Sequence, residues 1–482
     1  MSGPLRVAVY PEVACERMRP NQLSESIDFL SPDIVIATAP YHRSLLRRST
    51  EYDVPVITPA NQTGTWVHNV ADPLLVAIGS TKDISSLADL EAADELNPDT
   101  ETFLLSDLLT VDIDLTDLTT TLDGQADYEA ALNSNDIAGS YTHLTMNAPP
   151  DYRNNWGDLT VQGVVPGADG TGVEKTTTIT LLTLHRNGLV SSRDIDAGKF
   201  GLEALDEIGP NRADTLRDAG FTSKEDVANT PPHELQSMDG FGRKTAQKIH
   251  ASATALEDGD VHRTSDATVP HADPVFIDIE TDGLSPTIVW LIGVLDSASD
   301  RYLTFTTRDP DAKGKAVVNF MMWYTANASN RPIVAYHGQG FDFPVLKDHI
   351  QRHCSKYVDA WEDAWKFDPY WWAVKNNNAI LPGRTNKLED VAEGLGWETD
   401  DTGLTGGAVA HVMQRWLANP CEETEPDWEK HEAYCEDDVR SMAYVFDAIK
   451  DADRLGGIAT TGDATESDEE NVQTAQGTLS DF

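Results

Sequence analysis

Short apolar runs alternate with longer mixed segments through the first third of the chain. Three runs, at residues 6–10, 33–39 and 54–58, have the length and β-branched content of buried strands. The segments between them are long enough for helices, so this alternation predicts a parallel α/β region. A hairpin is expected over residues 177–196, where Asn187-Gly188 is a strong two-residue turn signal.

The same region contains little that points to a function. The acidic stretch 80–124 has no clear period, so we assign it no elements. No glycine-rich phosphate loop follows the first strand, which leaves a nucleotide-binding role without residues to support it. Residues 1–195 therefore predict an N-terminal α/β domain of unknown function.

The pattern changes twice in the middle of the chain. A helical texture runs from Phe200 to about Ala255 and predicts an all-α domain over residues 198–255. The polar residues 256–273 then predict a linker.

Strand patterns return in the last part of the chain. Runs at 274–280, 287–296 and 301–307 predict an antiparallel three-strand meander, and a further strand is expected at 332–337. Helical periodicity predicts five helices, at residues 316–327, 343–353, 387–395, 408–417 and 428–451. The predicted fold class is thus α/β multidomain, with a mixed sheet flanked by helices over residues 274–451. The small, polar and acidic residues 455–482 are expected to form a disordered tail.

The charge of the chain is extreme, although its core composition is ordinary. Eighty acidic residues oppose 36 basic ones, for a net charge of −44, while the hydrophobic fraction is 40%. Eleven tryptophans and 13 each of tyrosine and phenylalanine exclude disorder as the explanation. The composition resembles cytoplasmic proteins of salt-accumulating halophiles, where molar salt screens self-repulsion over ~3 Å. The net charge therefore does not exclude nucleic acid as a partner.

The cysteines and the hydropathy pattern predict a cytoplasmic location. Cys15, Cys354, Cys421 and Cys435 lie far apart without a Cys-x-x-Cys pair, which argues against disulfides and a thiolate zinc site. No signal peptide and no apolar run of about 20 residues is recognisable, so no membrane association is expected.

Carboxylates gather in three segments of the C-terminal region. Asp278 and Glu280 stand two residues apart in the first strand, so their side chains point to one face of the sheet. Two carboxylates that close repel each other unless a cation lies between them. Asp342 follows a strand at the start of a helix, and Tyr434 and Asp438 are four residues apart on one helical face.

These motifs resemble the ribonuclease-H-like 3′–5′ exonuclease superfamily with a tyrosine in its third motif. The order is Asp-x-Glu, then "FDFPVL" (341–346), then Tyr-x-x-x-Asp. Within the superfamily, this pattern most resembles YprB-type predicted nucleases and B-family polymerase proofreading domains. The resemblance covers residues 274–451. One position departs from the family, because His337 stands where an asparagine is usual.

The resemblance implies a ribonuclease H-like fold and a site with two Mg²⁺ or Mn²⁺ ions. The implied metal ligands are Asp278, Glu280, Asp342 and Asp438. Tyr434 would orient the attacking water together with Glu280. The implied substrate-positioning residues are Thr281, Gly283, Leu284, His337 and Phe341.

Each motif alone also has an ordinary explanation. An Asp-x-Glu pair in an acidic protein usually marks a solvated face, and Tyr434 would also fit a core position. The joint occurrence of the motifs in family order favours a catalytic site over a decayed copy of the fold.

A second resemblance lies upstream, in the all-α region. The segment "MDGFGRKTAQKI" (238–249) resembles a helix-hairpin-helix motif, whose glycines and free N–H groups let a phosphate approach. Residues 207–220 resemble a weaker first copy, in which we assign the missing second glycine to Asn211. The candidate nucleic-acid-binding residues are Gly240, Gly242, Arg243, Lys244, Thr245, Lys248, Gly209 and Arg212. The alternative is a pair of hairpins that packs as a protein-interaction module.

Together these features predict a metal-dependent 3′–5′ exonuclease that acts on DNA, single-stranded or at its ends, in repair or replication-associated processing. An RNA exonuclease and a non-catalytic nucleic-acid-binding scaffold are the alternatives. The sequence leaves protein partners, oligomeric state and the choice between endo and exo cleavage open.

Overall fold

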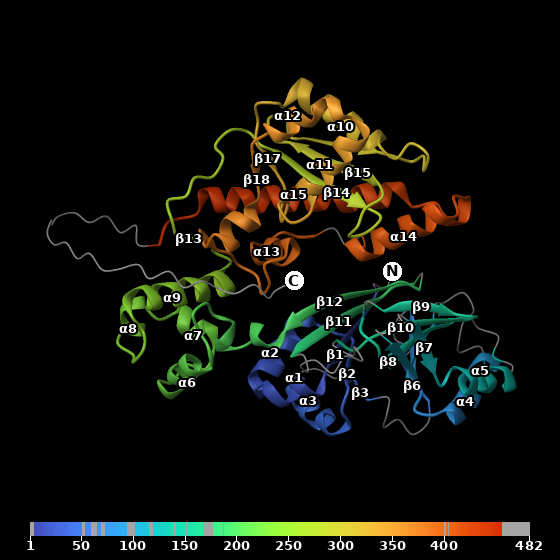
Figure 1. Ribbon diagram of the computed structural model, residues 1–482. Coiled ribbons are helices and arrows are strands. Elements are labelled where there is room, and N and C mark those ends of the chain that lie inside the picture. The colour runs from blue at the N-terminus through green and yellow to red at the C-terminus, as the bar shows by residue number, and fades with distance from the viewer. Residues whose placement is uncertain are drawn as a thin grey trace.

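Figure 1 shows the computed structural model of the chain, in which an N-terminal unit, a small helical unit and a C-terminal unit follow one another. The described residues are 4–50, 54–58, 65–68, 73–93, 102–114, 119–135, 137, 141–150, 152–166, 177–186, 188–399, 402 and 404–455. The expected tail beyond residue 455, and Asn187 of the expected turn, lie outside them. None of the helices in these ranges is both long and apolar enough to cross a bilayer.

The first sheet of the N-terminal unit confirms the parallel start and the hairpin. Its order is β12-β11-β1-β2-β3, with β1, β2 and β3 parallel and β11 and β12 antiparallel. The strands are β1 (Leu5–Tyr10), β2 (Ile34–Ala37), β3 (Val56–Ile57), β11 (Thr178–Leu184) and β12 (Val190–Asp196). Three helices cover its outer face: α1 (Glu12–Arg17), α2 (Pro20–Leu30) and α3 (Arg43–Ser49).

A second sheet packs against the inner face of the first, with order β4-β5-β6-β8-β10-β9 and β7 beside β6. Its strands are β4 (Trp66–His68), β5 (Leu74–Ala77), β6 (Thr102–Asp114), β7 (Thr119–Asp123), β8 (Tyr141–Asn147), β9 (Arg153–Trp156) and β10 (Leu159–Gly163). Val7 and Val9 of the first sheet share one core with Phe103 and Leu105 of the second, while α4 (Ile84–Ala92) and α5 (Gln125–Ser134) cover the outer face. The unit is therefore a four-layer α-β-β-α sandwich.

Four helices form the central unit around its own apolar core. They are α6 (Pro210–Asp218), α7 (Lys224–Ala228), α8 (Pro232–Leu235) and α9 (Arg243–Asp258). The chain then returns to the C-terminal unit through β13 (His262–Arg263), which pairs with β19 (Ala379–Ile380). Part of the expected linker is thus hydrogen-bonded to the unit that follows it.

The C-terminal unit is a mixed sheet with helices on both faces, as predicted. The sheet order is β16-β15-β14-β17-β18. The bounds are β14 (Val275–Thr281), β15 (Val289–Asp296), β16 (Arg301–Thr306), β17 (Ile333–Val334) and β18 (Lys366–Phe367). The expected strand at 332–337 is shorter because the chain turns after Val334. The helices are α10 (Lys315–Asn327), α11 (Asp342–His353), α12 (Val358–Glu362), α13 (Leu388–Gly394), α14 (Gly406–Ala418) and α15 (Trp428–Asp451).

The central strand β14 alternates strictly between two cores. Val275, Ile277 and Ile279 pack with α10 and α11, whereas Phe276 packs with α15. Because strand side chains have a period of two, Asp278 and Glu280 belong to the α15 face.

Glu25 of α2 joins all three units. Its carboxylate pairs with Lys224 of the helical unit and with Arg384 of the C-terminal unit, and it accepts the N–H of Gly201. Lys224 is almost fully buried, with 5% of its side chain exposed. Burial raises the pKa of Glu25, but Lys224 and Arg384 outweigh that effect and hold its pKa below the ordinary value.

We expect Glu25→Gln to lower the free energy of unfolding by about 3 kcal/mol, because it leaves the Lys224 ammonium buried without its principal counter-charge. Since the folded carboxyl has a lowered pKa, its contribution is present at neutral pH and lost as the pH falls through that pKa. The thermal unfolding midpoint of the variant should therefore lie below that of the unsubstituted chain at neutral pH, and the two midpoints should converge at acidic pH. Glu16→Gln, at an exposed position on α1, is the control. An unchanged midpoint at neutral pH would contradict the expectation.

Candidate functional site

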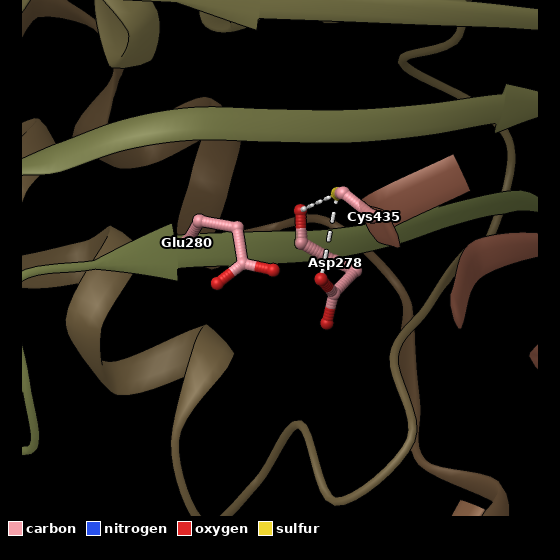
Figure 2. Close-up of side chains that lie close together, drawn as sticks. All are labelled: Asp278, Glu280 and Cys435. Atoms are coloured by element: carbon pink, nitrogen blue, oxygen red, sulfur yellow. Dashed lines mark hydrogen bonds between the residues drawn. The ribbon is translucent and has the colours of Figure 1, made fainter. Parts of the chain in front are cut away.

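Two carboxylates project from the middle and end of the central strand of the C-terminal sheet. Figure 2 shows Asp278 and Glu280 on β14 beside Cys435, which comes from α15. Ligand atoms of these three side chains all lie within 4.8 Å of one another. The register of β14 against β15 shifts between Glu280 and Thr281, and such a bulge re-aims side chains at the end of a strand.

Two further carboxylates reach the same place from helices. Asp342 is the first residue of α11 and is 6% exposed, and Asp438 lies on α15 one turn after Tyr434. The other three acids act on Asp278: burial raises the pKa of Asp278 first, followed by the charges of Glu280, Asp438 and Asp342. The structure therefore brings the four carboxylates predicted as metal ligands together.

The individual shifts show how unfavourable it is for these carboxylates to be ionised together. Burial, then Asp438 and Asp342, raises the pKa of Glu280 well above its usual value. Burial raises the pKa of Asp342 to about 7, and burial followed by Glu389 raises that of Asp438 to about 8. Carboxylate oxygens gathered under mutual repulsion fit a hard divalent cation such as Mg²⁺ or Mn²⁺.

Cys435 acts on the cluster as a hydrogen-bond donor. Its thiol lies 3.5 Å from Oδ2 of Asp278, and burial followed by the charge of Asp278 raises the thiol pKa well above its usual value. The sulfur therefore keeps its proton and orients Asp278. Gly293, which pairs with Asp278 across the ladder, leaves room for that sulfur, since a Cβ there would lie 2.5 Å from Sγ.

Tyr434 is held in its protonated form. Burial, followed by the charges of Asp438, Glu280 and Asp278, raises its pKa well above the ordinary value. Its hydroxyl is hydrogen-bonded to Asp438. Because the phenol keeps its proton near neutral pH, it can donate to an oxygen in the site.

Asp278, Glu280 and Asp438 line a cleft of about 270 Å³. Among the residues predicted to position substrate, Thr281, Gly283, Leu284 and Phe341 line this cleft together with Tyr434. Leu284 is 91% exposed, so an apolar side chain stands in solvent at the cleft. A nucleotide base would cover such a side chain.

His337 is placed differently from the other predicted positioning residues. Its backbone has a φ of +58°, its ring centroid lies 4.8 Å from that of Tyr370, and it lines a neighbouring hollow with Tyr336 and Lys387. It is absent from the lining of the acid cleft. The loop folds closely at Gly340, where a Cβ would lie 2.5 Å from the His337 ring unless that ring moved.

Sequence reasoning missed Asp368, Cys435 and Glu389. Asp368 is 2% exposed and accepts the N–H groups of His337 and Gln339 at 3.0 and 2.9 Å, so it holds the loop before Asp342. Its position in "KFDPY" (366–370), an acid between an apolar residue and proline, was the available signal. Cys435 adjoins the Tyr434 motif, and Glu389 lies in a helix that the sequence did predict.

The second hairpin of the helical unit is open to solvent. Gly240 has a φ of +79°, and Gly242 precedes the first turn of α9 as its N-cap. A Cβ at either glycine would meet nothing within 4 Å, and Arg243 and Lys244 beside them are exposed, with Thr245 half-buried. Free N–H groups and two cations can therefore approach a phosphate.

The first hairpin has a register different from the predicted one. Glu207, with a φ of +66°, takes the place of Gly240, and Gly209 takes that of Gly242 as the N-cap of α6. The missing glycine is thus the first one, at Glu207, and the assignment to Asn211 was wrong. The Glu207 carboxylate pairs with Lys248 at 3.2 Å and with Arg212 at 3.4 Å. Two of the four cations predicted to bind phosphate are therefore already paired with an acid.

Two regions of the chain match models of known families. Residues 275–450 match the RNase_H superfamily, and residues 201–254 match the SAM-like Helix-hairpin-helix tandem. The chain therefore carries a ribonuclease H-like domain preceded by a tandem helix-hairpin-helix domain. Among solved structures, a conserved uncharacterized protein from Streptococcus pneumoniae, a predicted phosphoesterase, aligns over 40% of this chain and 98% of its own. The identity is 11% and the TM-score 0.19, too low to support any conclusion.

We expect Mn²⁺ affinity to rise with pH between about 6 and 9, because a cation displaces protons from Asp342 and Asp438, whose pKa values are raised to about 7 and 8. Calorimetric titrations in buffers of different ionisation enthalpy should show proton release at neutral pH. Asp438→Asn should weaken binding, whereas Glu398→Gln, an exposed site, should not. An affinity that does not change with pH would contradict the displacement of protons from Asp342 and Asp438.

Proposed function

We propose that the chain is a metal-dependent 3′–5′ exonuclease that hydrolyses DNA. The observation that carries this proposal is the convergence of Asp278, Glu280 and Asp438 on one cleft that Tyr434 also lines, with Asp342 near enough for its charge to raise the pKa of Asp278 and Glu280. The match to the RNase_H superfamily over residues 275–450 supports the same reaction class.

The four carboxylates would hold two Mg²⁺ or Mn²⁺ ions. Such ions supply a nucleophile at neutral pH and stabilise charge on the attacking and leaving oxygens of a phosphodiester. The protein's own groups would do the rest of the work. Cys435 fixes the Asp278 carboxylate, Tyr434 donates its hydroxyl proton toward oxygens in the cleft, and Leu284 covers the terminal base.

The second hairpin would hold the phosphate backbone outside the cleft. Gly240, Gly242, Arg243 and Lys244 present N–H groups and cations without a means of reading base sequence. Phosphate contacts weaken steeply in molar salt, which we propose as the working medium of this acidic chain. Joining a weak anchor to a cleft in one chain raises the effective concentration of substrate at the cleft.

RNA remains the alternative substrate, because carboxylate chemistry does not read the sugar. A non-catalytic scaffold is less well supported. The unusual His337 lies outside the acid cleft, so its ring does not interfere with the carboxylates.

We expect Asp278→Asn to lower the hydrolysis rate by about 10²–10³-fold, because it removes one charge from the cation site. The assay uses 5′-labelled single-stranded DNA or RNA with Mn²⁺ in molar KCl. Stepwise shortening from the 3′ end is the expected pattern, and Glu398→Gln should match the unsubstituted chain. Equal digestion by the Asp278→Asn variant would disprove a metal-cluster mechanism, and initial cuts inside the strand would indicate an endonuclease.

We expect Glu207→Gln to strengthen DNA binding, because it removes the anion that occupies Lys248 and Arg212. With two more cations available to phosphates, the slope of log affinity against log salt should steepen by about 1–2. Fluorescence anisotropy with labelled DNA, in the Asp278→Asn background, measures both quantities. Glu234→Gln, an exposed position on α8, is the matched control. Identical slopes for the two variants would show that the first hairpin does not face the DNA.

A further inference from the structure

A groove of about 710 Å³ separates the N-terminal unit from the ribonuclease H-like domain. In Figure 1 it corresponds to the region where α14 faces the strands of the N-terminal unit. Arg153, Ser192 and Arg193 line it from β9 and β12, and Lys387 and His411 line it from the opposite side.

This groove is continuous with the acid cleft. Gly406, Gly407 and Ala410 line both, and a Cβ built on either glycine would meet nothing within 4 Å. The first turn of α14 therefore leaves the passage between them open. A smaller hollow beside the groove is lined by Ser191 of the N-terminal unit and also by Tyr434 and Asp438.

The charge of the lining is opposite to that of the chain. Arg153, Arg193 and Lys387 line the groove with one acid, Glu389. Arg193 is paired with Asp390, so the excess of cations is small, but the whole chain has 36 basic and 80 acidic residues. His411 adds no charge near neutral pH, because burial, followed by the charge of Arg153, lowers its pKa. A local excess of cations in so acidic a protein marks a path for a polyanion.

The groove wall is tied to the site through α13. Arg193 of β12 pairs with Asp390, whose side chain is 1% exposed, and the preceding residue, Glu389, acts electrostatically on Asp438. The N-terminal wall is therefore held at a defined place relative to the carboxylates.

We propose that the N-terminal unit forms one wall of an entry groove that guides the 3′ end of a single-stranded nucleic acid into the cleft. The volume lies in the range of pockets that hold small ligands, about 300–1,000 Å³, which suits a few unpaired nucleotides and excludes a duplex. Gly406 and Gly407 mark the point where the strand passes from groove to cleft. This assignment rests on the proposed exonuclease function and gives residues 1–196 a role in it.

A charge placed on the wall tests the proposal. Ser192 is exposed and lines the groove, so Ser192→Glu adds an acid there and Ser192→Gln adds the same bulk without charge. For a long single strand, Ser192→Glu should raise KM about five-fold over Ser192→Gln in the lowest salt that keeps the protein folded. For a dinucleotide, which fits the cleft alone, both variants should match the unsubstituted chain. Ser85→Glu, on α4, supplies the same charge away from the groove.

A crosslinking experiment reads the path independently of catalysis and salt. Single strands with 5-iodouridine two to five nucleotides from the 3′ end are irradiated on the Asp278→Asn protein, and crosslinked peptides are identified by mass spectrometry. Crosslinks to residues 150–162 or 188–193 support the groove. Crosslinks confined to the ribonuclease H-like and helix-hairpin-helix domains, with equal KM values for the Ser192 variants, overturn it. Failure to cleave the dinucleotide or the long strand would instead refute the proposed exonuclease function, while the crosslinks still report on the groove.

Discussion

Repulsion among four carboxylates, of which Glu280 and Asp342 are buried and Asp278 and Asp438 partly buried, is the constraint on which the C-terminal domain depends. A central strand supplies two of them, a helix start supplies the third and a long helix the fourth, and the two helix acids raise the pKa of both strand acids. Because the folded state holds these protons more tightly than the unfolded chain, the protonated cluster contributes stability that is lost as the pH rises toward about 8. The apolar cores on both faces of β14 must compensate for this cost, which persists where a function requires it.

The pairing of neighbouring site residues could be predicted from the sequence, whereas the residues that hold the surrounding loop in place could not. A period of two sets Asp278 beside Glu280, and four residues set Tyr434 over Asp438, so these pairs follow from short-range rules. Asp368 supports the loop before Asp342 through backbone hydrogen bonds that only the folded loop reveals. The position of His337 depends on its left-handed φ, which sequence spacing does not show.

The fold was predictable in proportion to how regular each segment is. The five predicted helices and the meander of the C-terminal domain have clear periods and match closely, as do β1 and β2, whereas the five-residue α12 was not predicted. Segment 80–124 could not be assigned from its sequence because the 13-residue β6 has no single period. Its first half is buried on both faces, between two cores, and its second half ends in acidic residues. The error over Asn211 has a similar origin. Glycine spacing suggested one register, while the backbone allows Glu207 to adopt the conformation that usually selects glycine.

The contact between Glu25 and Arg384 has a consequence for synthesis of the chain. These residues are 359 positions apart, so at about 5–20 residues per second a ribosome needs roughly 20–70 s to add the second after the first. Lys224 emerges earlier, 199 positions after Glu25. The nascent N-terminal unit must therefore remain folded and soluble while Glu25 still lacks a basic partner. The helical unit supplies Lys224 first, and the contact is completed by Arg384 only when the last third of the protein leaves the ribosome.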